Sequence, residues 1–283
     1  MDFNSPLLEF VQKEPKFIRQ ANYNLAEIIQ LREKHYLIFP IIDDAEKVIN
    51  VINFRYQKSY LPVDALIMAG GRGERLKPLT DNKPKPMLVI GQKPIIEHNI
   101  DRLYAHGIDD IWISVRYLGE QIEGYFKDGS EKSLRIQYVH ENDPLGTIGA
   151  LALIDNLVHD TILVMNSDLL TNIDFEDFYL FFKEQEADMA IASIPYTVNV
   201  PFAVFETDNH TITGLKEKPT YTHYSNAGIY LIKKSAISQI PKSEAFNATD
   251  LIELLITKKK KVVSYNLIGY WLDIGRHDDY TKA

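Results

Sequence analysis

The chain has 283 residues, of which 45% are hydrophobic and 25% are charged, and it contains no cysteine. This composition is typical of a globular protein and excludes disulfide bonds, thiolate catalysis and cysteine metal sites. The formal net charge of −8 argues against a general nucleic-acid or membrane-surface binder, because a phosphate-rich surface would repel the protein on average. The opening residues lack the basic and apolar regions of a signal peptide, and no apolar stretch reaches the roughly 20 residues of a membrane span. We therefore expect a cytoplasmic protein.

The first sixty residues follow a strand–helix–strand–strand pattern. The four expected elements cover residues 16–20, 24–35, 37–43 and 48–54. This order resembles a single module of the cystathionine-β-synthase (CBS) type, and such modules usually work in pairs. The resemblance implies that residues 1–60 form a partial regulatory segment that binds an adenine nucleotide. Because only one copy is present, pairing between chains in a homo-oligomer is left open.

Residues 61–283 alternate strands and helices, which predicts a second domain of α/β class with a mostly parallel, Rossmann-like sheet. Expected strands cover residues 65–69, 110–115, 136–141, 161–166 and 189–194, and expected helices cover residues 94–107, 118–126, 147–157 and 175–186. Helices lie on both faces of such sheets, and ligands bind at the carboxyl ends of the strands. Residues 203–215 read as a hairpin, so we expect an antiparallel extension that covers the sheet.

Residues 66–87, LIMAGGRGERLKPLTDNKPKPM, place three glycines after an apolar strand and then five cations. The stretch lacks the third glycine of a dinucleotide fingerprint and the ending of a Walker loop. A glycine turn can still aim backbone N–H groups at an anion. Arg75 offers a planar fork for phosphate oxygens, and Lys85 lies between two prolines that stiffen its segment. On composition alone, a solvated loop and a phosphate cradle both remain open.

The same stretch resembles the signature of the sugar-1-phosphate nucleotidylyltransferases, G-G-x-G-x-R-L-x-P-L-T followed by K-P-M. Glu74 stands where the commonest family residue is threonine. Further elements follow in the family's order at residues 141–150, 166–168, 217–219, 226–230 and 271–275. The resemblance covers residues 65–283 and points most closely to guanylyltransferases of the mannose-1-phosphate type.

This resemblance implies transfer of a nucleotidyl group from a nucleoside triphosphate to a sugar 1-phosphate, with release of pyrophosphate. It assigns catalytic charges to Arg75, Lys85 and Lys218, which would contact the pyrophosphate, the α-phosphate and the sugar phosphate. The implied nucleotide contacts are Ala69, Gly70, Gly71, Gly73, Glu141, Gly146 and Asp168. The implied sugar contacts, in the antiparallel extension, are Glu217, Asn226 and Gly228. Asp168 and Asp273 would hold Mg²⁺, which prefers hard oxygen ligands.

Glu141 also bears on the identity of the nucleotide. An ionised glutamate only accepts hydrogen bonds, and guanine offers two adjacent donors, whereas uracil and thymine offer one donor flanked by acceptors. A mismatch that leaves buried polar groups unpaired costs about 1–3 kcal/mol, so GTP is favoured. The alternatives are a thymidylyl- or uridylyltransferase acting on a hexose 1-phosphate, and a non-catalytic regulatory protein of the same fold that senses a nucleotide.

Overall fold

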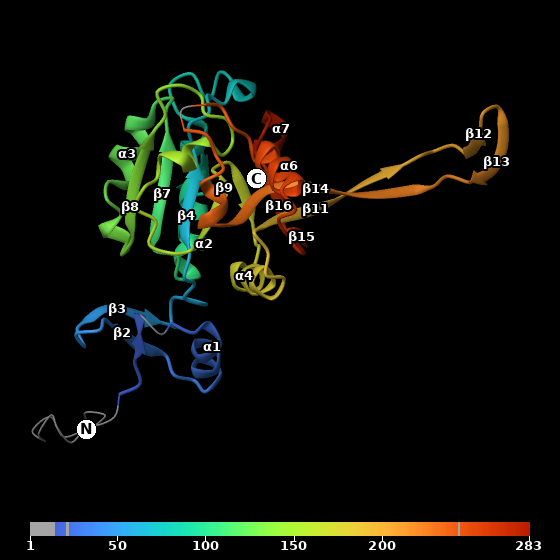
Figure 1. The fold of residues 1–283 in the computed structure, drawn as a ribbon. Coiled ribbons are helices and arrows are strands. Elements are labelled where there is room, and N and C mark those ends of the chain that lie inside the picture. The colour runs from blue at the N-terminus through green and yellow to red at the C-terminus, as the bar shows by residue number, and fades with distance from the viewer. Residues whose placement is uncertain (1–14, 21–22, 243) are drawn as a thin grey trace, which may run out of the picture. The chain divides into compact units, whose positions relative to one another are not determined.

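The structure is a computed structural model that describes residues 15–20, 23–242 and 244–283. The chain divides into two compact units, one formed by Met1–Pro62 with Ala105–Gly107 and the other by Val63–Tyr104 with Ile108–Ala283 (Figure 1). The opening residues, on which the signal-peptide expectation rests, lie largely outside the described part. Among the described residues, no helix is long and apolar enough to cross a membrane.

In its described residues, the smaller unit contains one helix and a three-stranded sheet in the order β1-β2-β3. Its elements are β1 (Ile18–Arg19), α1 (Leu25–Glu33), β2 (Ile38–Ile42) and β3 (Val48–Asn53). Ile28 of the helix packs with Phe39 and Ile52 of the sheet in a core of its own. The strand–helix–strand–strand order is therefore confirmed, while the likeness to a CBS module and the binding of an adenine nucleotide stay predictions.

The larger unit is built on a seven-stranded sheet in the order β15-β11-β14-β9-β4-β7-β8. The strands are β4 (Asp64–Met68), β7 (Asp110–Val115), β8 (Arg135–His140), β9 (Thr161–Asn166), β11 (Met189–Asn199), β14 (Thr220–Lys233) and β15 (Val262–Asn266). Neighbours pair in parallel except around β14, which is antiparallel to both β9 and β11. The predicted α/β class and the mostly parallel sheet are confirmed.

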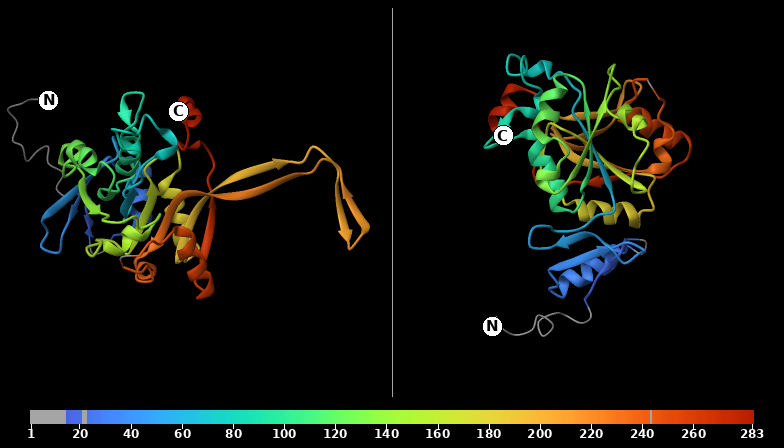
Figure 2. Two further views of the ribbon diagram at one scale, coloured as in Figure 1. Left: turned by 90° about the horizontal axis from the view of Figure 1, so that it is seen from above. Right: turned by 90° about the vertical axis from the view of Figure 1, so that its left-hand side faces the viewer.

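Helices cover this sheet on both faces. The helices of the larger unit are α2 (Ile95–Ala105), α3 (Gly119–Phe126), α4 (Phe175–Glu184), α5 (Lys234–Ile237), α6 (Ala248–Thr257) and α7 (His277–Lys282). In Figure 2 the green α2 and α3 lie on one side of the sheet and the orange α6 on the other. Leu251 and Leu255 of α6 pack in one core with Val164 of β9 and Ile232 of β14, so burial of apolar strand residues fixes this layer.

The helix predicted over residues 147–157 is wrong, because the structure has only a 3₁₀ turn at Gly149–Leu153. Backbone groups around this turn bond to a distant segment. The N–H of Ile148 donates to the carbonyl of Phe246, and the N–H of Phe246 donates to the carbonyl of Leu145. These tertiary hydrogen bonds compete with the ladder that a helix would need.

The strands β11 and β14 continue beyond the sheet as a two-stranded ribbon. A third strand borders β11 only over Met189–Ser193 and β14 only over Ile229–Lys233. The ribbon then carries the hairpin of β12 (Val204–Asp208) and β13 (Thr211–Lys216). We call residues 194–225 the arm. It is antiparallel as predicted, but the expectation that it covers the sheet is wrong, because it projects away from the sheet (Figures 1 and 2).

Candidate functional site

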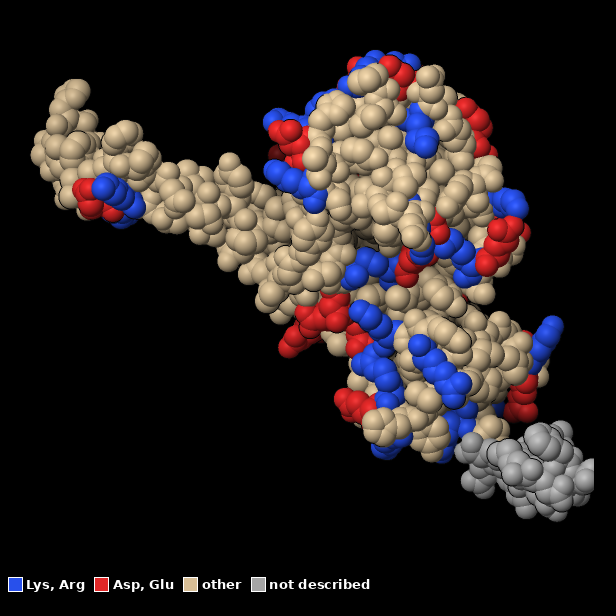
Figure 3. All heavy atoms as spheres, turned by 180° about the vertical axis from the view of Figure 1, so that it is seen from behind, with Lys and Arg blue, Asp and Glu red and all other residues tan. Residues whose placement is uncertain are grey.

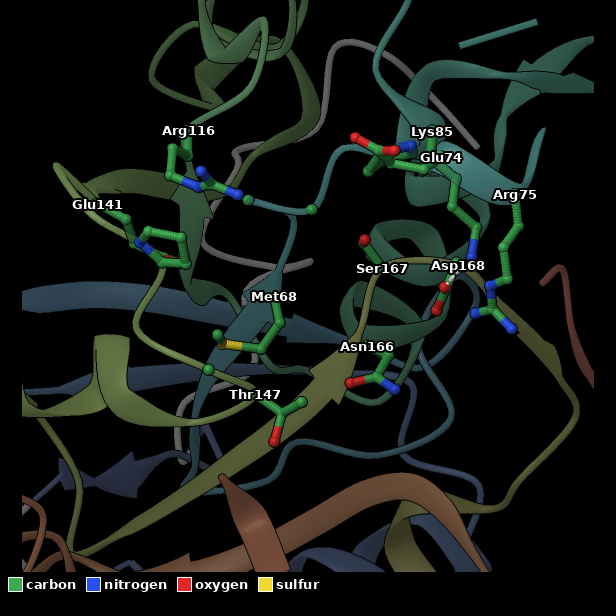
Figure 4. A pocket seen from close by; sticks show the side chains of 16 residues that line it. Met68, Glu74, Arg75, Lys85, Arg116, Glu141, Thr147, Asn166, Ser167 and Asp168 are labelled. Carbon is green, nitrogen blue, oxygen red and sulfur yellow. Dashed lines mark hydrogen bonds and ion pairs between the residues drawn. The ribbon is translucent and has the colours of Figure 1, made fainter. Parts of the chain in front are cut away.

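A cavity of about 400 Å³ lies at the carboxyl ends of β4 and β9. These strands are parallel neighbours, and Met68 pairs with Asn166, so their carboxyl ends lie side by side. The residues that line the cavity are Met68, Gly70, Gly71, Gly73, Glu74, Arg75, Lys85, Pro86, Arg116, Glu141, Pro144, Gly146, Thr147, Asn166, Ser167 and Asp168 (Figure 4). The volume falls in the range typical of small-molecule sites.

The glycine turn forms one wall of this cavity. It leaves β4 at the buried Ala69, whose N–H donates to the carbonyl of Ser114 over 3.0 Å. A Cβ atom at Gly70 would lie 2.9 Å from Oε1 of Glu141, whereas one at Gly71 would meet no atom within 4 Å. The backbone at Gly71 is therefore open to a ligand, and Gly70 is required for the close approach of Glu141.

Gly73 brings the lysine segment against the glycine turn. Its φ of 64° is left-handed, and a Cβ atom there would lie 2.9 Å from Cβ of Lys85. Pro84 is extended and precedes a 3₁₀ turn at Lys85–Met87, so the start of this turn is held rigid. The glycine turn and the lysine, predicted as parts of one cradle, thus line one cavity.

Lys85 is the best-anchored charge of the site. Only 8% of the residue is exposed, and its ammonium forms an ion pair with Oδ2 of Asp168. The same nitrogen lies 3.9 Å from Oδ1 of Asp273. Burying a charge is costly unless it is paired, and two carboxylates pair with this ammonium.

A short antiparallel ladder brings these two carboxylates together. It joins β10 (Leu169–Thr171) to β16 (Trp271–Asp273), with Leu169 paired to Asp273. Beyond the ladder, the N–H of Ile274 donates to the carbonyl of Asp168 over 3.0 Å. Two residues far apart in the sequence thereby become neighbours. Burial and the charge of Asp168 raise the pKa of Asp273, while Lys85 and Arg75 oppose that rise.

The two carboxylates fit a magnesium ion. Oδ1 of Asp168 and Oδ1 of Asp273 are both buried, and neither has a hydrogen-bond partner within the described residues. The same part of the chain holds no cluster of three or more His, Cys, Asp or Glu side chains that could bind a metal alone. Mg²⁺ is usually held by one or two carboxylates and completes its shell with phosphate oxygens and water. Asp168 and Asp273 match that donor set.

Arg75 lies at the rim of the cavity on the same side as Lys85 and Asp168 (Figure 4). It belongs to the 3₁₀ turn Glu74–Leu76, and a Cβ atom at Gly275 would lie 3.5 Å from its Nη1. Arg75 also lines a second cavity of about 360 Å³ together with Arg276 and His277. The guanidinium therefore lies beside the Asp273 strand and faces open space, where it can bind phosphate oxygens in a bidentate manner.

Glu141 lies at the other end of the cavity, away from Lys85. The hydroxyl of Ser114 donates to its Oε1 over 2.8 Å, and the N–H of Leu145 donates to its Oε2 over 3.2 Å. Each oxygen keeps a further lone pair. Gly146, with a left-handed φ of 77°, lines the cavity on the same loop.

Arg116 lines the same end of the cavity and is a residue that the sequence reasoning missed. It directly follows β7, and its Nε is buried without a hydrogen-bond partner in the part of the chain that the structure describes. Figure 4 shows Arg116 and Glu141 at the same end of the cavity. Its place after the strand 110–115 was the available signal, because ligands bind at such strand ends.

The residues predicted to bind the sugar are divided between two places. Gly228 lies against the cavity, since a Cβ atom there would lie 2.6 Å from Nδ2 of Asn166. Asn226 lies at the base of the arm, where its side chain bonds to the hydroxyl of Tyr230 and the N–H of Gly228. Glu217 and Lys218 lie on the arm beyond the outer end of β14 and are not among the lining residues of the cavity. The structure therefore does not bring them to Lys85.

Comparisons with known proteins agree with this geometry. Residues 64–283 match the model of the nucleotidyl transferase family. The chain is 35% identical to the bifunctional protein GlmU of Methanocaldococcus jannaschii, with 78% of this chain and 53% of that protein covered. It is 32% identical to a mannose-1-phosphate guanylyltransferase of Mycobacterium tuberculosis, with 78% and 63% covered.

A solved structure, HddC from Yersinia pseudotuberculosis complexed with GMP-PN, matches with a TM-score of 0.60 and 25% identity. That match covers 78% of this chain and 97% of the solved one. The chain thus spans between about half and two thirds of the two curated relatives, and the family model covers residues 64–283. With the glycine turn, the buried lysine and the paired carboxylates in place, the chain belongs to the nucleotidyl transferase family.

Proposed function

We propose that the protein transfers a nucleotidyl group from a nucleoside triphosphate, preferentially GTP, to a sugar 1-phosphate. The observation that carries this proposal is the buried ammonium of Lys85, paired with Asp168 and Asp273 in the cavity that the open backbone of Gly71 also lines. The reaction brings several phosphates together, so it needs fixed positive charge and metal ligands. Lys85 and Arg75 supply the charge, and Asp168 and Asp273 supply the carboxylate oxygens.

The reaction needs no protein nucleophile. An oxygen of the sugar phosphate attacks the α-phosphorus of the triphosphate, a new P–O bond forms, and the bond to the β-phosphate breaks as pyrophosphate leaves. Lys85 holds the α-phosphate and stabilises the charge that develops on its oxygens. Arg75 binds the departing pyrophosphate with its planar fork, and Lys218 binds the phosphate of the sugar.

Asp168 and Asp273 hold Mg²⁺ in this proposal, and the ion supplies neutralisation of phosphate charge when it is bound. The ion pair with Lys85 keeps Asp168 oriented towards the cavity in the absence of substrate. Glu217 and Asn226 bind sugar hydroxyls, for which planar polar side chains provide paired donors and acceptors.

The preference for GTP rests on the two side chains that flank Gly70. The remaining lone pairs of Glu141 accept hydrogen bonds from N1–H and the N2 amine of guanine, while Ser114 and Leu145 hold its carboxylate in place. The guanidinium of Arg116 donates to O6 and N7, as arginine does to guanine in other settings. The relative from Mycobacterium tuberculosis and the GMP-PN complex of HddC both involve guanine nucleotides by name, which supports this choice.

Replacing Glu141 by glutamine is expected to lower the ratio of kcat/KM for GTP over UTP by about 10- to 100-fold. Glutamine presents one donor and one acceptor, which leaves a guanine donor unpaired and suits uracil instead, at about 1–3 kcal/mol. The ratio is measured from pyrophosphate release with each nucleotide. Asp143→Asn, on the exposed part of the same loop, is the matched control and should leave the ratio unchanged. An unchanged ratio in Glu141→Gln would contradict the role given to this residue.

Arg116→Gln is expected to raise KM for GTP about 10-fold or more, with a smaller effect on UTP. Loss of a bidentate contact to guanine corresponds to about 1–3 kcal/mol of discrimination. Initial rates over a range of GTP and UTP concentrations provide the measurement. Equal losses for both nucleotides would instead place Arg116 on the phosphates or the ribose.

The activity itself is tested by pyrophosphate release with Mg²⁺ across four nucleotides and a panel of sugar 1-phosphates. We expect the highest rates with GTP and one sugar. Release with UTP or dTTP alone would replace the guanylyl assignment by a uridylyl or thymidylyl one. Absence of release across the whole grid would favour a regulatory protein that keeps the fold.

A further inference from the structure

The arm places Lys218 far from the cavity of its own chain. Gly228 lies against Asn166 at the cavity wall, and β14 runs without interruption from there to Thr220. At about 3.3 Å per residue, this stretch alone separates Thr220 from the cavity by about 26 Å. Lys218 lies two residues further out and is exposed. Its ammonium would have to come within about 4 Å of a phosphate to form an ion pair, which its own cavity does not allow.

Pairing between β11 and β14 holds the ribbon together outside the sheet. Ile194 pairs with Ser225, and pairing continues residue by residue to Asn199 and Thr220. The register shift in this pair of strands lies between Ile191 and Ser193 of β11, opposite Asn226 and Tyr230 of β14, at the base of the arm. Folding the arm back at any point between Ile194 and Asn199 would require breaking this ladder.

The cavity lacks a cation for the second substrate. Among the described residues that line it, the cations are Arg75, Lys85 and Arg116. The proposed function assigns all three to the nucleoside triphosphate. A sugar 1-phosphate brings a further charged phosphate to the same place, so the site of a single copy is incomplete.

The arm also exposes an apolar surface. Phe205 pairs with Leu215 and Thr207 with Ile212, which places the three apolar side chains on one face of the hairpin, each 55–58% exposed. On the other face, Glu206 and Lys216 form an ion pair of 2.8 Å. In the view of Figure 3, most of the arm surface belongs to uncharged residues, with one acidic and one basic cluster near the tip. An isolated two-stranded hairpin is only marginally stable in water, so this face requires a partner surface.

We propose, on the basis of the proposed function, that the arm of one protomer reaches the cavity of a second copy of this chain. There it supplies Lys218 and Glu217 to the sugar 1-phosphate, while the apolar face of its hairpin packs on that copy. A second copy is the fitting occupant because it presents the same incomplete cavity. A two-fold axis makes the exchange reciprocal and completes both sites.

The contact can be tested without reference to catalysis, because the chain has no cysteine of its own. Glu74→Cys, at the cavity rim, and Lys218→Cys are placed on separate chains that carry tags of different size, and the two are co-expressed. A short bifunctional thiol reagent should link the two chains and give a band of their summed mass under denaturing conditions. Lys183→Cys, on the exposed side of α4, replaces Glu74→Cys as the control and should give no such band. A chain that is monomeric, or a band of equal strength with the control, would overturn the proposal.

The function of the exchange is tested by complementation. Lys85→Met, the cavity variant, and Lys218→Met, the arm variant, should each be inactive alone. The mixed dimer of these two variants, purified through both tags, should recover about half of the wild-type rate. In it, the intact arm of the Lys85→Met chain completes the intact cavity of the Lys218→Met chain, while the other site stays inactive. A dimer of the wild-type chain with the double variant should be inactive, because neither of its sites is complete.

Folding of each arm onto its own cavity would reverse both results, leaving the mixed dimer inactive and the second dimer half active. The two proposals can therefore fail separately. A cross-link without any wild-type activity would end the proposed function and leave the exchange standing. Wild-type activity without cross-link or rescue would end the exchange alone.

Discussion

Replacing Lys85 by alanine is expected to lower kcat/KM for nucleotidyl transfer by about 10²- to 10³-fold. A preorganised donor aimed at developing charge has about this effect when it is removed from a site shielded from water. Lys85 is the charge that the fold holds most firmly, since its segment is stiffened by Pro84 and Pro86 and its ammonium is paired with Asp168. Its loss would also leave Asp168 and Asp273 as unscreened neighbours of like charge. Pyrophosphate release at varied GTP concentration measures the effect.

Lys83→Ala is the matched control for that experiment. Lys83 lies two residues away in the same proline-rich segment, but it is exposed and does not line the cavity. Its removal should leave kcat/KM unchanged. Circular dichroism spectra of both variants should match the wild type. Equal losses of activity in the two variants would mean that general positive charge, and not the position of Lys85, assists the reaction.

The sequence was sufficient to predict the scaffold of the site, for a physical reason. Alternating apolar strands and amphipathic helices allow few arrangements other than a parallel sheet with covered faces, and such a sheet gathers its loops at one edge. Arg75 and Lys85 line the cavity, whereas Arg72 stacks over the ring of Tyr117.

The sequence did not reveal the direction in which the arm projects or the distance of Lys218 from the cavity. The alternation of residues in β11 and β14 predicts an antiparallel pair, but it is the same whether the pair lies on the sheet or leaves it. What decides is where a third strand stops pairing, at Ser193 and at Ile229. For this reason the sequence led us to expect that the arm covers the sheet and that Lys218 lies in the same site as Lys85. The structure shows neither. Arg116 was missed because a single arginine after a strand matches no motif.

Asp273→Asn is expected to lower kcat/KM by about 10²-fold or more while making the folded protein more stable at neutral pH. The loss of activity follows from the removal of one of two carboxylates that suit Mg²⁺. The gain in stability follows from the pKa of Asp273, which burial and the neighbouring Asp168 raise above the ordinary value of 3.8.

The sign of the stability effect is fixed by proton linkage. Between the ordinary pKa and the raised one, the unfolded chain has lost the proton of Asp273 while the folded protein still binds it. The free energy of unfolding therefore falls as pH rises through this window, and above it the ionised carboxylate continues to disfavour the folded state. Asparagine carries no charge and removes this effect. At acid pH, where Asp273 is protonated in both states, the variant and the wild type should differ least.

Urea unfolding at pH values on both sides of that window measures the difference, with Asp81→Asn, an exposed aspartate, as the control that should not change it. The midpoint of Asp273→Asn should exceed that of the wild type more at neutral than at acid pH. Addition of Mg²⁺ should narrow the gap, because an ion that binds only the folded wild type stabilises it by mass action. A variant that is less stable than the wild type at every pH would mean that Asp273 serves mainly as a partner of Lys85. A variant that is more stable than the wild type at neutral pH would show that the Asp273 carboxylate destabilises the fold and is retained to bind a cation.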